Sequence, residues 1–247
     1  MKRIDVRLRG LAMILWVTLL ALGTPAATPA ADDINVLFVG NSFTINNNMP
    51  KMIEELAKAG KQRSLHTRIA GSGSTLEKGW NTPEVLTSLR FRKWDYVVLQ
   101  EHMMNLLDNR QAMIEYGKKF DAEIKKQEAK TLLYVTFAYK AKPTTQATIT
   151  KANQDLAKEI GAGIAPVGVA WELALAADKQ LDLHDKDGRH PNPAGSYLAA
   201  CVFYATIYGK SPEGLPAGAS KLQDAEARRL QASAWKAVQE STGKSKD

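Results

Sequence analysis

The sequence predicts an α/β fold, a three-layer α/β/α sandwich around a central parallel sheet of about five strands. Short apolar runs rich in β-branched residues alternate along the chain with stretches of helical periodicity, an order that predicts parallel strands joined by helices. The clearest runs are apolar at nearly every position, as is typical of strands covered by helices on both faces. No repeat or linker interrupts the pattern, so residues 31–247 are expected to form one domain.

Five segments are the expected strands. The run INVLFV at 34–39 is strongly β-type, and YVVL at 96–99 and LLYVTF at 132–137 resemble it. Weaker runs lie at 65–70 and 164–167. Because strands in a parallel sheet need crossover connections, a helix is expected between successive runs.

Apolar residues recur at helical spacing outside these runs. Two stripes each define one face of a helix: Met113, Gly117, Phe120 and Ile124, then Ile149, Ala152, Leu156 and Ile160. A third helix is expected to begin around 192–194 and to continue through the apolar stretch 196–209. An amphipathic helix near 222–240 is expected to precede a polar tail.

The first thirty residues have the pattern of a cleaved secretory signal peptide. Four basic residues lie within 1–10, an almost wholly apolar run occupies 11–22, and small residues and prolines follow to Ala31. The apolar run is shorter than the roughly 20 residues that span a bilayer. We expect cleavage near Ala30 or Ala31 and a periplasmic or secreted protein without membrane association.

Charge and cysteine content exclude several classes of protein. The formal net charge is +7, but residues 1–30 hold four basic residues and one acidic residue, so +4 remains after cleavage. That excess is ordinary and gives no argument for a nucleic-acid partner. The single cysteine, Cys201, excludes a disulfide framework and a thiolate zinc site. The sequence does not indicate an oligomeric state.

Polar residues follow the expected strands where each strand ends. Residues 40–42 (GNS) follow the first strand, 71–75 (GSGST) the second and 100–102 (QEH) the third. In open parallel sheets, active sites lie outside the carboxyl ends of the strands. Together with 187–191 (DGRHP), which precedes a helix, these segments are therefore the candidates for chemistry.

Ser42 has two interpretations from the residues alone. A serine directly after a buried strand can expose its hydroxyl at the rim of the sheet, near a helix N-terminus that stabilises negative charge. Serine is also a favoured helix N-cap. The presence of His190 favours the interpretation of Ser42 as a nucleophile, because a serine hydroxyl needs a base to act as one at neutral pH. Asp187, three residues earlier, can accept a hydrogen bond from the imidazole Nδ1; an ordinary loop hydrogen bond is the alternative.

Two other kinds of site are less consistent with these residues. A zinc site can be drawn from four late side chains: His184, Asp185, Asp187 and His190. It would leave Ser42 and Gly73 unexplained. A flavodoxin-like nucleotide binder is also weak, because residues 71–75 lack the lysine of a P-loop and the spacing of a dinucleotide site. We therefore expect no metal and no cofactor.

Four blocks in order resemble the SGNH (GDSL-type) hydrolase superfamily. They are VLFVGNSFT at 36–44, GSGST at 71–75, DYVVLQE at 95–101 and DGRHPNPAG at 187–195. Each block is weak alone, but their ordered combination is specific, and the resemblance spans about residues 34–210. It implies the flavodoxin-like SGNH fold, in a branch with Gly-Asn-Ser and a Leu-Gln-Glu third block.

The resemblance also implies a role for each candidate residue. Ser42 matches the nucleophile, and Asp187 and His190 match the acid and the base of a Ser-His-Asp triad. The N–H groups of Ser42 and Gly73 match donors of the oxyanion hole, the group of hydrogen-bond donors that stabilises the negatively charged tetrahedral intermediate.

The third block departs from the superfamily pattern, because it lacks the usual Gly-x-Asn-Asp. A side-chain amide is expected to donate to the oxyanion at that point. Gln100, at the end of the expected strand, is the preferred candidate, and Asn105 is its rival.

The predicted function is a serine esterase that hydrolyses acyl esters through an acyl-enzyme intermediate. The expected substrate is a small-molecule or carbohydrate ester, and the extracytoplasmic location favours O-acetyl groups on carbohydrate. The alternative is a catalytically inactive carbohydrate-binding protein on the same scaffold, which the missing Gly-x-Asn-Asp block suggests.

Overall fold

Five parallel strands form the central sheet of the computed structural model, which describes residues 33–72 and 75–243. Their spatial order is β2-β1-β3-β4-β5. The strands are β1 (Ile34–Gly40), β2 (Leu65–Ser72), β3 (Tyr96–Leu99), β4 (Lys130–Tyr134) and β5 (Gly163–Ala165). All described residues belong to one compact unit, which begins at Asp32. The predicted signal peptide at 1–30 and the last four residues of the polar tail lie outside the described residues.

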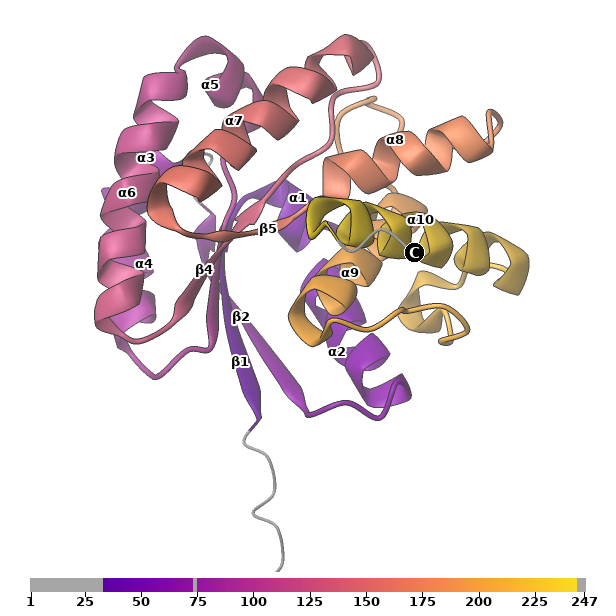
Figure 1. Ribbon diagram of the computed structural model, residues 1–247, viewed down its shortest axis with the longest axis horizontal. Coiled ribbons are helices and arrows are strands. Elements are labelled where there is room, and N and C mark those ends of the chain that lie inside the picture. Colours follow the sequence, from indigo (N-terminus) through magenta and orange to yellow (C-terminus); the bar gives the residue numbers. More distant parts are fainter. Residues whose placement is uncertain (1–32, 73–74, 244–247) are drawn as a thin grey trace, which may run out of the picture. The chain divides into compact units, whose positions relative to one another are not determined.

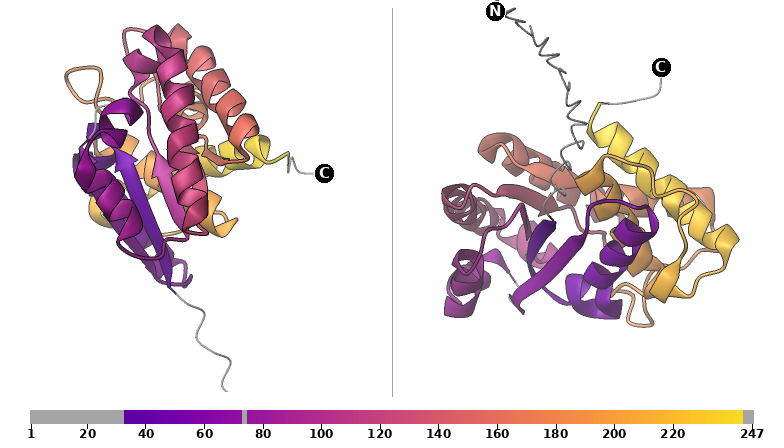
Figure 2. Two further views of the ribbon diagram at one scale, coloured as in Figure 1. Left: turned by 90° about the vertical axis from the view of Figure 1, so that its left-hand side faces the viewer. Right: turned by 90° about the horizontal axis from the view of Figure 1, so that it is seen from below.

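Helices cover both faces of the sheet, which confirms the predicted three-layer arrangement (Figure 1). One face carries α3 (Leu76–Trp80), α4 (Pro83–Arg90), α5 (Met103–Asp108), α6 (Arg110–Lys126) and α7 (Gln146–Ile160). The other carries α2 (Met49–Ala59), α8 (Val167–Ala177), α9 (Pro193–Tyr208) and α10 (Asp224–Ser241). The left-hand view of Figure 2 looks onto the layer that includes α6. Each face has its own cluster of buried apolar side chains.

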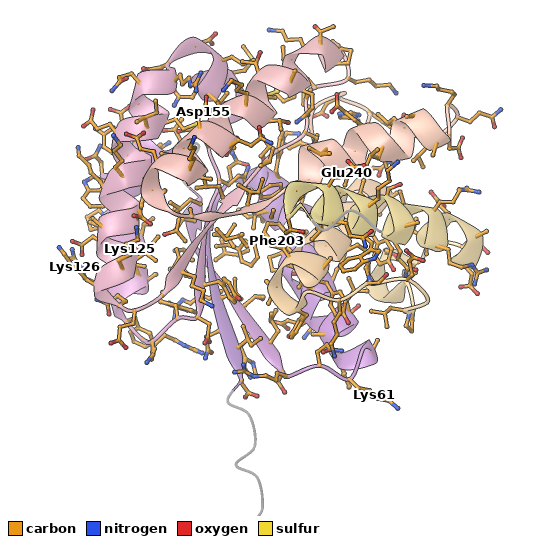
Figure 3. All side chains as sticks on the ribbon, viewed as in Figure 1. Lys61, Lys125, Lys126, Asp155, Phe203 and Glu240 are labelled. Atoms are coloured by element: carbon orange, nitrogen blue, oxygen red, sulfur yellow. The ribbon has the colours of Figure 1, made fainter. Side chains whose placement is uncertain are left out.

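Helix α9 is apolar on all sides because other elements surround it. It packs against α2, α8 and α10, and the four consecutive residues 198–201, which together point to every side of the helix, are all fully buried. The Phe203 ring meets the β1 residue Phe38 edge to face, with ring centroids 5.3 Å apart (Figure 3). Since α10 lies over α8 and α9, α9 is sealed into the core and its position is held from several directions.

Two predicted strands end earlier in the structure than the apolar pattern suggested. The run 132–137 is strand only as far as Tyr134, and the run 164–167 only as far as Ala165. Strand pairing with β5 ends at Tyr134 and Ala165, and the chain turns into α8 at Val167. The Val135 N–H still donates to the Ala165 carbonyl oxygen at 3.0 Å, and its carbonyl oxygen accepts from the Gly168 N–H at 2.8 Å. Val135 to Phe137 are nevertheless buried. Burial alone explains why these residues are mostly apolar, since a residue can be buried without belonging to a paired strand.

The predicted helices lie close to their expected positions. The stripes from Met113 and Ile149 belong to α6 and α7, the helix expected near 192–194 is α9, and the helix expected near 222–240 is α10. Within the described residues, none of the helices combines the length and apolar character that crossing a membrane requires. Three 3₁₀ turns, at 46–48, 143–145 and 218–220, complete the fold, together with the short helix α1 (Ser42–Ile45).

Candidate active site

Ser42 occupies the first position of α1, directly after the turn that ends β1. Asn41 is the N-cap of this helix: its backbone is extended, with φ −127° and ψ −157°, and its Oδ1 accepts a hydrogen bond from the Phe43 N–H at 3.0 Å. The alternative that Ser42 itself caps the helix is therefore wrong. Because Asn41 supplies the cap, the Ser42 hydroxyl is left for other contacts.

A buried polar network holds the turn that carries Ser42. The Gln100 Oε1 accepts hydrogen bonds from the Thr44 hydroxyl at 2.7 Å and from the Asn41 N–H at 3.3 Å. The Gln100 Nε2 donates to the Asn41 Oδ1 at 2.5 Å. Gly40 allows this close packing, because a Cβ there would lie 2.6 Å from the Thr44 Oγ1 and 2.7 Å from the Gln100 Oε1. The turn that carries Ser42 is thus tied to the end of β3.

The loop before α9 brings His190 to Ser42. The His190 Nε2 lies 2.9 Å from the Ser42 Oγ, although the two residues are 148 positions apart in the chain. The imidazole ring also meets the Phe43 ring at 85°, with centroids 5.8 Å apart. Since Pro193 begins α9 and Asn192 caps it through the Gly195 N–H, the buried helix anchors the loop that presents the base.

Asp187 lies behind the His190 ring, opposite Ser42. One carboxylate oxygen, Oδ2, is 2.5 Å from the His190 Nδ1, and Oδ1 accepts from the backbone N–H groups of Arg189 and His190 at 2.9 and 3.0 Å. These hydrogen bonds, led by the one from the His190 side chain, hold the pKa of the Asp187 carboxyl well below its usual range. An ionised Asp187 favours the tautomer with the proton on Nδ1, which leaves Nε2 to accept the Ser42 proton.

The residues predicted to line the oxyanion hole have different placements. Gly73 lies outside the described residues, so its role stays a prediction. Gln100 is 2% exposed, and its amide nitrogen donates to Asn41 within the network that holds the turn. Asn105, in the first turn of α5, has a buried Nδ2 that makes no hydrogen bond of regular geometry among the described residues, although the side chain lies close enough to the Glu101 carboxylate to lower its pKa. Of the two amides, Asn105 is the one with a donor still to be satisfied.

Glu101 is a buried acid at this edge of the sheet whose importance the sequence did not indicate. Its carboxylate accepts from the His102 N–H at 2.6 Å and from the Leu76 N–H, at the start of α3, at 3.4 Å. The side chain therefore ties the end of β3 to the segment that follows the loop 71–75. Burial raises the pKa of Glu101 to about 7, and the two backbone hydrogen bonds, together with the nearby Asn105 side chain, offset only part of that effect.

His184 is buried in the core. Its ring packs against Phe137 and Trp171, and its Nε2 lies 3.0 Å from the Ala138 carbonyl oxygen. Burial lowers the pKa of this imidazole. Among the residues that the structure describes, no three histidine, cysteine or acidic side chains form a group able to hold a metal ion. The zinc site drawn from 184–190 is accordingly not assembled.

Comparison with known proteins identifies the fold. No protein-family model and no curated protein matches the sequence. Among solved structures, a DUF4886 family protein from Bacteroides uniformis is 20% identical with a TM-score of 0.68, over 84% of this chain and 95% of that one. A putative SGNH hydrolase from Slackia heliotrinireducens is 27% identical with a TM-score of 0.56, over 71% and 100%. An acetyl xylan esterase, AlAXEase, is 15% identical with a TM-score of 0.57, over 70% and 100%.

These similarities confirm the predicted superfamily, and the chain has the SGNH hydrolase fold. The similarity to the putative SGNH hydrolase supports placing the chain among the hydrolases. The SGNH hydrolase superfamily is the one that four short sequence blocks, taken in order along the chain, predicted.

The raised pKa of Glu101 predicts a pH dependence of stability. The folded-state pKa of about 7 lies above the ordinary value of 4.5, so the native state holds this proton more tightly than the unfolded state does. The free energy of unfolding should therefore fall as the pH rises from about 4.5 to about 7. The contribution of this one group is on the order of 3 kcal/mol.

Urea unfolding of Glu101→Gln and wild-type protein between pH 5 and pH 8 measures this contribution. The free energy of unfolding of the wild type should fall relative to that of the variant across this range. Glu213→Gln, at an exposed surface position, serves as the control and should follow the wild type. Parallel curves for Glu101→Gln and wild type would contradict the assigned burial effect.

Proposed function

We propose that the protein is a serine esterase that uses Ser42, His190 and Asp187 as a catalytic triad. The observation that carries the proposal is the hydrogen-bonded row from the Ser42 Oγ through the imidazole to the Asp187 carboxylate, with distances of 2.9 and 2.5 Å. A nucleophile in contact with a base, and a base oriented by a carboxylate, is the arrangement that activates a hydroxyl at neutral pH.

Acylation begins with attack by the Ser42 hydroxyl on the ester carbonyl. The His190 Nε2 takes the hydroxyl proton as the Ser42 Oγ forms a bond to the carbonyl carbon. The imidazolium that results is stabilised by the ionised Asp187. His190 then gives the proton to the leaving alcohol oxygen as the carbon–oxygen bond breaks, which leaves the acyl group on Ser42.

Hydrolysis of the acyl-enzyme repeats these steps with water as the nucleophile. His190 takes a proton from the water, a second tetrahedral intermediate forms, and the proton returns to the Ser42 Oγ as the acid is released. Both intermediates carry a negative oxygen that needs hydrogen-bond donors. The Ser42 N–H is one proposed donor, because the first N–H groups of a helix have no partner within the helix. The Gly73 N–H and a side-chain amide are the other proposed donors.

An O-acetylated carbohydrate is the proposed substrate class. Two considerations support it: the proposed secretion signal at 1–30, which would bring the enzyme to polysaccharides outside the cytoplasm, and the similarity in fold to an acetyl xylan esterase. A second candidate is a catalytically inactive carbohydrate-binding protein on the same scaffold. It is favoured by the engagement of the Gln100 amide nitrogen with Asn41, since an oxyanion donor must be available to substrate.

Substitution of the nucleophile or the base should abolish ester hydrolysis. We expect Ser42→Ala and His190→Ala each to lower kcat/KM for a short acyl ester by on the order of 10⁴-fold. The free energy of unfolding should change little, because the Ser42 hydroxyl and the half-buried imidazole lie at the surface of the sheet's edge.

Ser64→Ala and His66→Ala are the matched controls for these two variants. Both residues are exposed and lie near the amino end of β2, at the opposite edge of the sheet. They should hydrolyse the ester at the wild-type rate. Wild-type rates in Ser42→Ala or His190→Ala, with the fold verified by circular dichroism, would refute the triad.

The two candidate amides should respond differently to substitution. Asn105→Ala should lower kcat by about 100-fold, the usual effect of removing one oxyanion donor, with little change in the free energy of unfolding. Gln100→Ala should instead lower the free energy of unfolding by roughly 1–3 kcal/mol, because it leaves buried partners on Asn41 and Thr44 unsatisfied.

Steady-state kinetics and urea unfolding on both variants separate these roles. A large loss of kcat in a stable Gln100→Ala, together with wild-type turnover in Asn105→Ala, would assign the donor to Gln100.

A further inference from the structure

A cavity of about 730 Å³ opens beside the proposed triad. Three segments build its wall: residues 102–104 after β3, residues 139–142 after β4, and residues 186–189 before His190. The second and third segments are joined by a hydrogen bond from the Lys140 N–H to the Gly188 carbonyl oxygen at 2.9 Å. The size suits a small-molecule binding site.

Aromatic contacts connect this cavity to the nucleophile. Tyr139, in the wall, meets the Phe43 ring with centroids 6.4 Å apart. Phe43 follows Ser42 in the chain and also contacts the His190 ring. Asp187 itself belongs to the cavity wall, so the cavity adjoins the side chains of the proposed triad, and we expect a substrate held at Ser42 to extend toward it.

The cavity wall is strongly basic. Four of its side chains are cationic: Lys140, Lys142, Lys186 and Arg189. Lys140 is paired with Asp182 at 2.7 Å. The other three cations have no carboxylate within ion-pair distance among the described residues: Lys142 reaches only the Met104 sulfur, at 3.8 Å, and Arg189 lies 5.9 Å from the centroid of the Tyr139 ring.

The acidic groups near the cavity do not neutralise the positive charge of its wall. Asp187 is the one acid in the described wall, and both of its oxygens are engaged by the His190 loop. The neighbouring Asp185 accepts a hydrogen bond from the Lys186 backbone N–H, at 2.7 Å. Three exposed cations therefore face one cavity, and an anionic group entering it would form new ion pairs without displacing existing ones.

We propose that this cavity binds an anionic group, a carboxylate carried by the alcohol portion of the ester substrate. The inference rests on the proposed function and narrows its substrate class to acyl esters of acidic alcohols, such as O-acetylated sugar acids. The alcohol portion is assigned because His190 must deliver its proton to the leaving oxygen, and the cavity wall includes the residues directly before His190. The planar guanidinium of Arg189 suits a carboxylate.

Two matched pairs of esters test the proposal. The alcohol-side pair is 4-acetoxybenzoate and its neutral methyl ester, and the acyl-side pair is phenyl hydrogen succinate and phenyl methyl succinate. For each pair, the ratio of kcat/KM for the charged over the neutral ester is divided by the corresponding ratio of hydroxide-catalysed rates. For the alcohol-side pair the corrected ratio should be about 10 or more at low ionic strength and should fall toward 1 in 0.5 M NaCl, as screening requires.

Substitution of the unpaired cations should lower the same ratio. Lys142→Gln, Lys186→Gln and Arg189→Gln should each reduce it by roughly 2- to 5-fold, the usual effect of one exposed charge. Lys61→Gln is the control: Lys61 is exposed in the turn between α2 and β2, at the far end of the sheet (Figure 3), and its substitution should leave the ratio unchanged.

The outcomes separate this proposal from the proposed function. Hydrolysis of both alcohol-side esters with a corrected ratio near 1, insensitive to salt and to the three substitutions, would overturn the anionic subsite and leave the esterase intact. A preference confined to the acyl-side pair would overturn the assignment to the alcohol portion. Failure of the wild type to hydrolyse any of the four esters would overturn both proposals.

Discussion

The chemistry proposed for this protein depends on one hydrogen bond, between the Ser42 Oγ and the His190 Nε2. The two residues come from opposite ends of the domain, and the sheet makes their meeting possible, because parallel strands direct all their carboxyl ends to one edge. The turn after β1 presents the serine there. The base reaches the same edge because α9, buried between the sheet and α10, begins three residues after His190 and holds its loop in place.

Buried polar contacts beneath the serine give the site its rigidity. Gln100 connects β3 to both Asn41 and Thr44, and Glu101 connects β3 to the start of α3. In a buried environment such hydrogen bonds are strong, and a partner left unsatisfied is costly, so the network favours a single conformation of the nucleophile turn. The amide of Asn105 is an exception to this pattern, because its buried Nδ2 makes no regular hydrogen bond among the described residues. A donor left available in this way suits the role proposed for it, stabilising a charge that exists only during the reaction.

The sequence predicts much of the fold, because burial on both faces leaves an apolar run that is easy to recognise. Its limit appears at strand ends: the run 135–137 is as apolar as β4, and only the tertiary structure shows that strand pairing ends at Tyr134. Ser42, His190 and Asp187 were predicted as a triad because their short blocks occur in a known order; the structure brings the three side chains into contact, and their catalytic role stays a prediction. Three features depend on tertiary contacts instead: the direction of the Gln100 amide, the burial of Glu101, and the cavity whose basic residues come from separate segments.

Reaction with a fluorophosphonate tests the central claim most directly, because this reagent modifies a serine hydroxyl only when a neighbouring base activates it. The folded wild-type protein should gain one phosphonyl group, located by mass spectrometry of its peptides on Ser42. His190→Ala should react far more slowly, and Ser42→Ala should not be labelled. A folded wild-type protein that stays unmodified, or one modified at another serine, would contradict the triad and favour a protein that binds carbohydrate without cleaving it.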